Sequence, residues 1–406
     1  MQQPLYYTGT SPTPPLTTAL AALAQRPPPA YELHKAGTYR PGAGLVAAAN
    51  VAILLGQPLL LTGEPGTGKT RFAYALAQAL GLGKVHECFV KSTTTARDLF
   101  YSFDELARFR DNQAGQAQPL QRYLSFNGLG RAILFAGGAE HALELLPGLA
   151  FETAPEGDSG LGLLKGRGPR VERPQRLGDL YPRGAFPSAP AATLVLIDEL
   201  DKAPRDTPND MLNEIERLGF DIPELGVRVA VPSDPKTRPV IVITSNSEKS
   251  LPEPFLRRCV YHDIPFPAAA LREIVYAQVK GLQGSGAASD DASSSGAVLT
   301  DALLTDALAL FDRLRDRSRI QRPPGTAELL SWIDTLLAAG LPTGDGLRAP
   351  LAAALEARAG PRTNLVRNAA PNLVESLLAV LVKKAEDHSA AIDVIRQWVQ
   401  LPKPAA

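Results

Sequence analysis

Three glycines, a lysine and a threonine lie at fixed spacing between residues 63 and 70, in the order G-x-x-x-x-G-K-T. A polyphosphate needs several backbone N–H donors converging on its oxygens, and only a glycine-rich turn lets the backbone approach so closely. Lys69 would offer a positive charge to the β- and γ-phosphates, and Thr70 a hydroxyl to Mg²⁺. The motif therefore predicts binding of ATP or GTP, by Gly63, Glu64, Pro65, Gly66, Thr67, Gly68, Lys69, Thr70 and Arg71.

The segments on either side of this loop are those that a phosphate site requires. The apolar run 58–61 predicts a buried strand before the loop. Residues 71–80 are rich in alanine and leucine and predict a helix, which Gly81 would end. The N-terminus of that helix would add about half a positive charge beside the phosphates.

Two carboxylates follow a second buried-strand pattern at 193–199. Asp198 would hold Mg²⁺ directly or through water, and Glu199 would orient and polarise the attacking water. Surface acids at a strand end are the alternative, but a phosphate loop upstream at domain-scale separation favours the catalytic interpretation.

A third apolar strand at 240–243 runs into Thr244-Ser245-Asn246. Asn246 would stand at a strand end, where its amide could sense the γ-phosphate or its water. Asparagine is also a common turn former, so the residue by itself leaves both interpretations open.

With these motifs in view, the sequence resembles the AAA+ ATPases, and within them the MoxR-like branch, over about residues 37 to 400. The resemblance rests on the segments 58–70, 197–204, 244–246 and 251–258, which occur in the family's order. It implies that Arg258 is an arginine finger completing the nucleotide site of a neighbouring subunit, with the adjacent Arg257 as the alternative. It also places Tyr39, before the first helix, near the adenine.

The resemblance further implies a function. The chain would hydrolyse ATP with Mg²⁺ at the interfaces of a homo-oligomeric ring, a hexamer, and would remodel or activate a protein client. The resemblance implies that this client or partner carries a von Willebrand factor A domain. GTP is not excluded, because phosphate motifs contact a part common to all nucleotides.

The expected fold is α/β: an AAA+ P-loop core with a parallel five-stranded sheet and a large insertion, followed by an α-helical lid. The resemblance assigns the strands to residues 58–62, 85–90, 193–199, 239–244 and 261–266. The expected domains are a flexible extension at 1–36, the ATPase domain at 37–267 with an insertion at about 98–192, and the lid at 268–406 with a flexible loop at 281–297. The second sensor arginine that the family places in the lid is missing from its usual position, and Arg319 or Arg322 are the candidates to replace it.

Composition sets outer limits. The 406 residues carry 42 basic and 42 acidic side chains, so the formal net charge is zero and no overall field attracts the chain to nucleic acid or an anionic membrane. No apolar run approaches the roughly 20 residues of a membrane span, and we expect a cytoplasmic protein. The two cysteines are too few for a disulfide framework.

Two further functions stay open beside the ring ATPase. A basic, glycine-rich stretch at 160–176 motivates a nucleic-acid translocating or restriction-type NTPase, although a solvated loop explains the stretch more simply. The missing second sensor arginine motivates a nucleotide-switched scaffold with little turnover.

Overall fold

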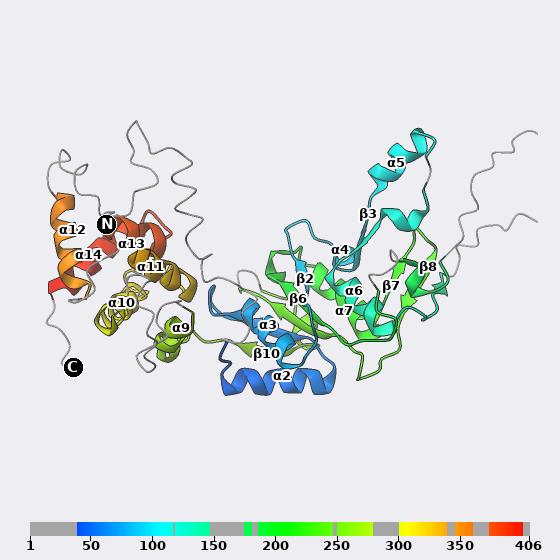
Figure 1. The fold of residues 1–406 in the computed structure, drawn as a ribbon, viewed down its shortest axis with the longest axis horizontal. Coiled ribbons are helices and arrows are strands. Elements are labelled where there is room, and N and C mark those ends of the chain that lie inside the picture. Colours follow the sequence, from blue (N-terminus) through cyan, green and yellow to red (C-terminus); the bar gives the residue numbers. More distant parts are fainter. Residues whose placement is uncertain are drawn as a thin grey trace, which may run out of the picture. The chain divides into compact units, whose positions relative to one another are not determined.

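The computed structural model describes residues 39–116, 118–146, 174–180, 186–246, 250–278, 300–338, 346–359 and 373–400. The expected extension at 1–36, the loop at 281–297 and residues 160–173 of the basic stretch lie outside these ranges. The chain divides into two compact units (Figure 1). The main unit is built from His34–Glu64 and Gly68–Pro265, and the smaller unit contains Phe266–Ala406.

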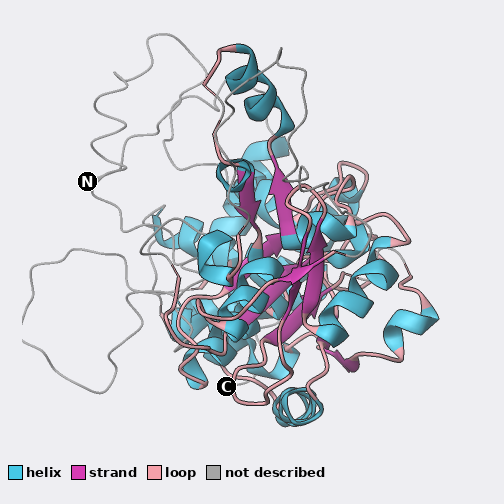
Figure 2. Ribbon diagram, turned by 90° about the vertical axis from the view of Figure 1, so that its right-hand side faces the viewer, coloured by secondary structure: helices cyan, strands magenta, loops and turns pink. Residues whose placement is uncertain are grey.

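The main unit is organised around a five-stranded parallel sheet in the order β10-β1-β9-β6-β2 (Figure 2). Its strands are β1 (Leu59–Thr62), β2 (His86–Phe89), β6 (Leu194–Asp198), β9 (Val240–Thr244) and β10 (Val260–Asp263). The α/β fold class with a parallel five-stranded sheet is confirmed. The last strand was expected at 261–266 but spans Val260–Asp263, because its neighbour in the sheet, β1, ends at Thr62; Ile264 N makes a last bond to Thr62 O at 2.9 Å.

The inner strands are apolar on both faces because each face is covered by helices. Leu59 and Leu61 of β1 pack in one cluster with α2 (Ala43–Leu55) and α3 (Lys69–Ala79). Leu60, between them, points to the opposite face and joins a second cluster with α6 (Gly128–Gly137) and α7 (Thr207–Arg217). A parallel sheet buried in this way produces the continuous apolar runs that the sequence displays. The edge strands β2 and β10 are less buried.

The segment between β2 and β6 holds far more than a single crossover helix. It contains α4 (Ala96–Phe100), β3 (Tyr101–Phe103), α5 (Glu105–Gln113), β4 (Leu124–Phe126), α6 and β5 (Glu144–Leu145). Strands β3 and β4 pair antiparallel, and α5 lies at the far end of this ribbon in Figure 1. Tyr123 and Phe126 are buried.

A second antiparallel sheet in the order β5-β8-β7 follows α7. Its hairpin consists of β7 (Gly219–Ile222) and β8 (Val227–Ala230), and the short helix α8 (Glu253–Leu256) precedes β10.

The smaller unit is helical. It comprises α9 (Leu271–Gln278), α10 (Asp301–Leu314), α11 (Thr326–Ala338), α12 (Arg348–Ala359), α13 (Leu373–Leu381) and α14 (Asp387–Gln400). The Thr300 hydroxyl accepts from Leu303 N and so caps α10. Trp332, Trp398 and Phe311 are almost fully buried in its core. Among the described residues, no helix is long and apolar enough to cross a membrane.

Candidate functional site

The phosphate loop joins β1 to α3 through backbone conformations that favour glycine. Gly63, Gly66 and Gly68 have φ values of 134°, 82° and 93°, a region that residues with a Cβ rarely adopt. A Cβ on Gly68 would also lie 2.9 Å from Cε2 of Tyr39. The sequence-predicted Tyr39 is therefore positioned beside the loop, where its ring also packs on Phe72 at a centroid distance of 5.9 Å.

Lys69 is the buried cation of the loop, with 6% of its surface exposed. Its Nζ donates to Gly63 O at 2.8 Å and to Glu64 O at 2.9 Å. Burial lowers the pKa of Lys69, and the nearby carboxylates, Asp198 first among them, oppose that shift. The Lys69 ammonium is thus held against the backbone carbonyls at the start of the loop.

Arg71 and Tyr39 form the other side of the loop. Burial lowers the pKa of Arg71, against the opposing influence of Tyr39. Burial raises the pKa of Tyr39 to about 12, and Arg71 partly offsets the rise. Tyr39 therefore stays a neutral phenol over the physiological pH range.

Asp198 is hydrogen-bonded to residues of a neighbouring strand and of helix α3. Its Oδ1 accepts from Thr70 Oγ1 at 3.0 Å and from Thr244 Oγ1 at 2.6 Å. Ile197 of β6 is in register with Ile243 of β9, so the next residues, Asp198 and Thr244, leave the sheet side by side. Thr70 arrives from the first turn of α3.

Glu199 follows in the left-handed region, with φ 59° and ψ 49°, which is uncommon for a residue with a side chain. Its N–H donates to Thr244 Oγ1 at 2.9 Å, which ties this backbone position to β9. Its carboxylate accepts at Oε1 from Asn246 Nδ2 at 3.2 Å and pairs at Oε2 with Lys202. The predicted sensor Asn246 and the predicted base Glu199 are therefore brought into direct contact.

Three further residues belong to this cluster but were not among the sequence-predicted site residues. Thr244 bridges Asp198 and Glu199, Asp201 accepts from Asn246 N at 3.3 Å, and Lys202 pairs with Glu199. A usable signal existed for Thr244, since it is the polar residue at the end of a strand expected to neighbour β6. Asp201 and Lys202 lie within the segment 197–204, but that segment by itself does not indicate which residues they contact.

The two arginines after α8 have partners outside this cluster. Arg258 Nη1 donates to Asn213 Oδ1 at 3.5 Å, and its Nε lies 3.4 Å from Glu216 Oε1, both on α7. Arg257 is largely exposed and lies 4.0 Å from Glu253 in the preceding turn. In the smaller unit, Arg319 Nη1 donates to Gln397 at 2.5 Å, while the backbone N–H of Arg322 donates to Asp387 at 3.2 Å.

The donor set suits a Mg²⁺-nucleotide. Thr70 and Asp198 present hard oxygen ligands at one point, and Mg²⁺ is commonly bound by one or two protein oxygens together with phosphates. In the part of the chain that the structure describes, no group of three or more His, Cys, Asp or Glu side chains is arranged to hold a metal on its own. The residues present therefore fit a metal that is completed by a nucleotide.

Comparisons with known proteins agree with this geometry. Residues 58–142 match the family model described as AAA domain (dynein-related subfamily); the matched region includes the phosphate loop and ends before Asp198. No curated protein matches the chain.

Several solved structures are similar at low identity. NtrX from Brucella abortus is 13% identical with a TM-score of 0.37, and the alignment covers 81% of this chain and 55% of that one, so the chain spans about half its length. The FIGL-1 AAA domain is 12% identical with a TM-score of 0.36, covering 89% and 88%. The Thermotoga maritima RuvB Holliday junction branch migration motor is 15% identical with a TM-score of 0.31, covering 87% and 85%.

These TM-scores are too low to bear on function. The evidence for a family is therefore the match of residues 58–142, which are similar to an AAA domain of the dynein-related kind and lie in the unit that contains the parallel sheet.

Proposed function

We propose that the chain is a MoxR-like AAA+ ATPase that hydrolyses ATP at the subunit interfaces of a hexameric ring and uses the turnover to remodel or activate a protein client. The observation that supports this most directly is the Asp198 cluster. One carboxylate oxygen accepts from both Thr70 and Thr244, at 3.0 Å and 2.6 Å, and the acid next in sequence is held by Asn246.

The roles proposed for the loop follow from its geometry. Its backbone N–H groups and Lys69 would hold the phosphates, and Thr70 with Asp198 would hold Mg²⁺. When bound, Mg²⁺ would neutralise the charge that develops on the phosphate oxygens. Tyr39, on the loop's other side, would contact the base.

Glu199 is the proposed general base. A base of this kind must keep a carboxylate oxygen within hydrogen-bond reach of the attacking water. Asn246 contacts Oε1 and Lys202 pairs with Oε2, while the Thr244 hydroxyl accepts from the Glu199 N–H, so both the carboxylate and the backbone of Glu199 are held in position.

Arg258 is proposed to act on the nucleotide of a neighbouring subunit. Its contacts in the single chain are with Asn213 and Glu216 of α7, away from Asp198. This arrangement suits a residue that works across a subunit interface, and Arg257 remains the alternative finger. The client class, proteins with a von Willebrand factor A domain, and a cytoplasmic location are proposed from the family resemblance.

The test is phosphate release from the purified chain with ATP and with GTP, beside Glu199→Gln. The variant should keep nucleotide binding and lose turnover by a factor on the order of 10² to 10⁴, because the water loses its positioned base. Turnover that rises more steeply than protein concentration would support assembly into a ring. Wild-type rates in Glu199→Gln would refute the proposed base, and binding without any wild-type turnover would favour a nucleotide-switched scaffold.

A further inference from the structure

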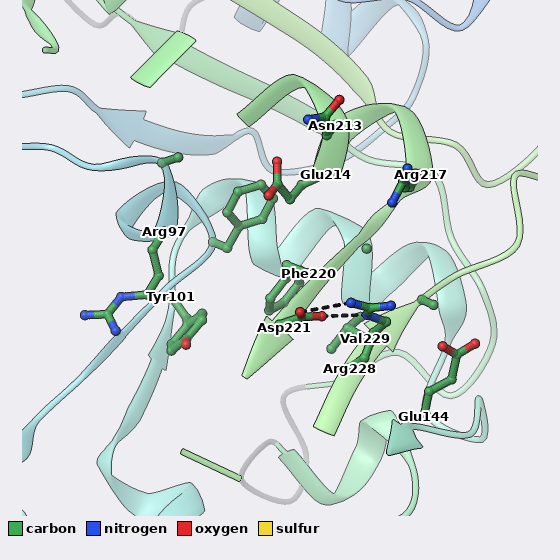
Figure 3. A pocket seen from close by; sticks show the side chains of 14 residues that line it. Arg97, Tyr101, Glu144, Asn213, Glu214, Arg217, Phe220, Asp221, Arg228 and Val229 are labelled. Carbon is green, nitrogen blue, oxygen red and sulfur yellow. Dashed lines mark hydrogen bonds and ion pairs between the residues drawn. The ribbon is translucent and has the colours of Figure 1, made fainter. Parts of the chain in front are cut away.

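A groove of about 370 Å³ lies on the main unit between α4, α7 and the β7–β8 hairpin (Figure 3). Its floor and walls include three aromatic side chains, Phe100, Tyr101 and Phe220. Its volume is near the lower end of the range of about 300–1,000 Å³ for small-ligand sites. It is separate from the Asp198 cluster, since none of that cluster's residues lines it.

Most charged side chains around the groove already have partners. Arg228 forms two bonds with Asp221, at 2.6 Å and 3.0 Å, drawn as dashed lines in Figure 3. Arg97 lies 3.3 Å from Glu224, with its guanidinium 5.8 Å from the centroid of the Tyr101 ring. These pairs balance one another's charge.

Glu214 differs from its neighbours. It lines the groove, and its Oε2 atom is buried with no hydrogen-bond partner among the described residues. Burial raises the pKa of Glu214, and the carboxylates of Asp210 and Asp221 raise it further, while a hydrogen bond to the residue's own backbone and the charge of Arg217 act in the opposite direction. A buried acceptor without a donor is unfavourable, and a charged one more so.

Outside these pairs, the charged side chains that line the groove are Glu214, Glu144 and Arg217, so acids exceed bases by one. Asp210 does not line the groove but adds negative charge near Glu214, so the groove favours a cation over a phosphate or other polyanion. A guanidinium or ammonium group would supply the donor that Oε2 lacks, beside aromatic rings whose faces attract cations.

We propose that this groove is a binding site for an arginine or lysine side chain of a polypeptide partner, with Glu214 receiving the cation. Asn213 also lines the groove and accepts from Arg258, so an occupant would sit beside the contact that orients this arginine. The proposal goes beyond the ATPase and does not depend on turnover.

The experiment measures fluorescence anisotropy of a labelled five-residue peptide with one central arginine, titrated with the full chain. The comparison peptide carries citrulline, which has nearly the same shape without the charge. We expect the arginine peptide to bind at least about tenfold more tightly, because a charge-assisted bond to the Glu214 carboxylate is lost with the citrulline peptide.

Two variants locate the site. Glu214→Gln keeps the size of the side chain and should weaken binding of the arginine peptide by about tenfold or more. Glu105→Gln, on α5 outside the groove, is the matched control and should leave binding unchanged. The proposal is overturned if the arginine peptide shows no saturable binding, if citrulline binds equally well, or if Glu214→Gln behaves like Glu105→Gln.

Discussion

Replacing Thr244 by valine would test whether the hydroxyl between Asp198 and Glu199 holds the candidate site together. Thr244 is 1% exposed, so valine fits its volume while removing only the hydroxyl. The change deletes the 2.6 Å bond to Asp198 and the 2.9 Å bond from Glu199 N. Asp198 keeps Thr70 as a donor, whereas the Glu199 N–H loses Thr244 Oγ1 as its acceptor.

The size of the effect follows from these losses. An unsatisfied buried donor costs about 1–3 kcal/mol, and the left-handed backbone at Glu199 carries a strain of roughly 1–2 kcal/mol that this bond helps to hold. We therefore expect the free energy of unfolding to fall by about 1–3 kcal/mol. If a similar loss applies to the transition state, kcat falls by about 10- to 100-fold.

The assay combines urea unfolding with steady-state phosphate release from ATP, and Thr244→Ser is the matched control because it keeps the hydroxyl. KM should change little in Thr244→Val, since the phosphate loop is untouched. The reasoning is refuted if Thr244→Val retains both wild-type stability and wild-type kcat, or if Thr244→Ser loses as much as Thr244→Val. The unfolding arm is informative even if the wild-type chain shows no turnover.

Three further predictions concern the loop, the finger and a buried thiol. Gly68→Ala should weaken ATP binding, measured by calorimetry, at least about tenfold, because φ 93° is strained for alanine and its Cβ would clash with Tyr39. The control is Gly81→Ala, whose φ is 67° but whose Cβ would point into open space. This variant should lower stability and leave the ATP affinity unchanged. Arg258→Ala should lower ATP turnover without removing ATP binding. Mixing this variant with Lys69→Ala should restore part of the phosphate release, because a mixed interface can combine an intact Lys69 with an intact Arg258. A complete lack of rescue would argue against an arginine finger supplied by the neighbouring subunit. Burial raises the pKa of Cys88 to about 11. Because the unfolded chain releases this proton at lower pH than the folded chain, the free energy of unfolding should fall between about pH 9 and 11. In chemical unfolding across that range, Cys88→Ala should lose stability less steeply than wild type, and equal slopes would contradict this reasoning.

Much of the fold could be predicted because its signals are local. The inner strands are short apolar runs bounded by turn residues, and β1, β6 and β9 begin and end within one residue of their expected limits. The boundary of β10 was less accurate, because an edge strand ends where its neighbour β1 ends, at Thr62, and the apolar pattern of β10 does not record that limit.

The site was predictable only where a contiguous motif supplied it. The loop from Gly63 to Thr70 is encoded by adjacent residues, since its backbone needs glycines at fixed spacing and its cation follows directly. Sequence spacing also placed Asp198, Glu199 and Asn246 at strand ends, although it could not say which of them would touch.

The amino-acid sequence by itself therefore determined the phosphate loop, the buried strands and the acids that follow one of them, because each depends on neighbours a few residues away. The tertiary structure decided the rest: the Thr244 bridge, the Asn246–Glu199 contact, the contacts of Arg258 with α7, and the groove in which Glu214 Oε2 has no hydrogen-bond partner among the described residues. These contacts join residues 45 to 47 positions apart in sequence in the first three cases. Their distances depend on strand order, register and helix packing, which no local pattern encodes.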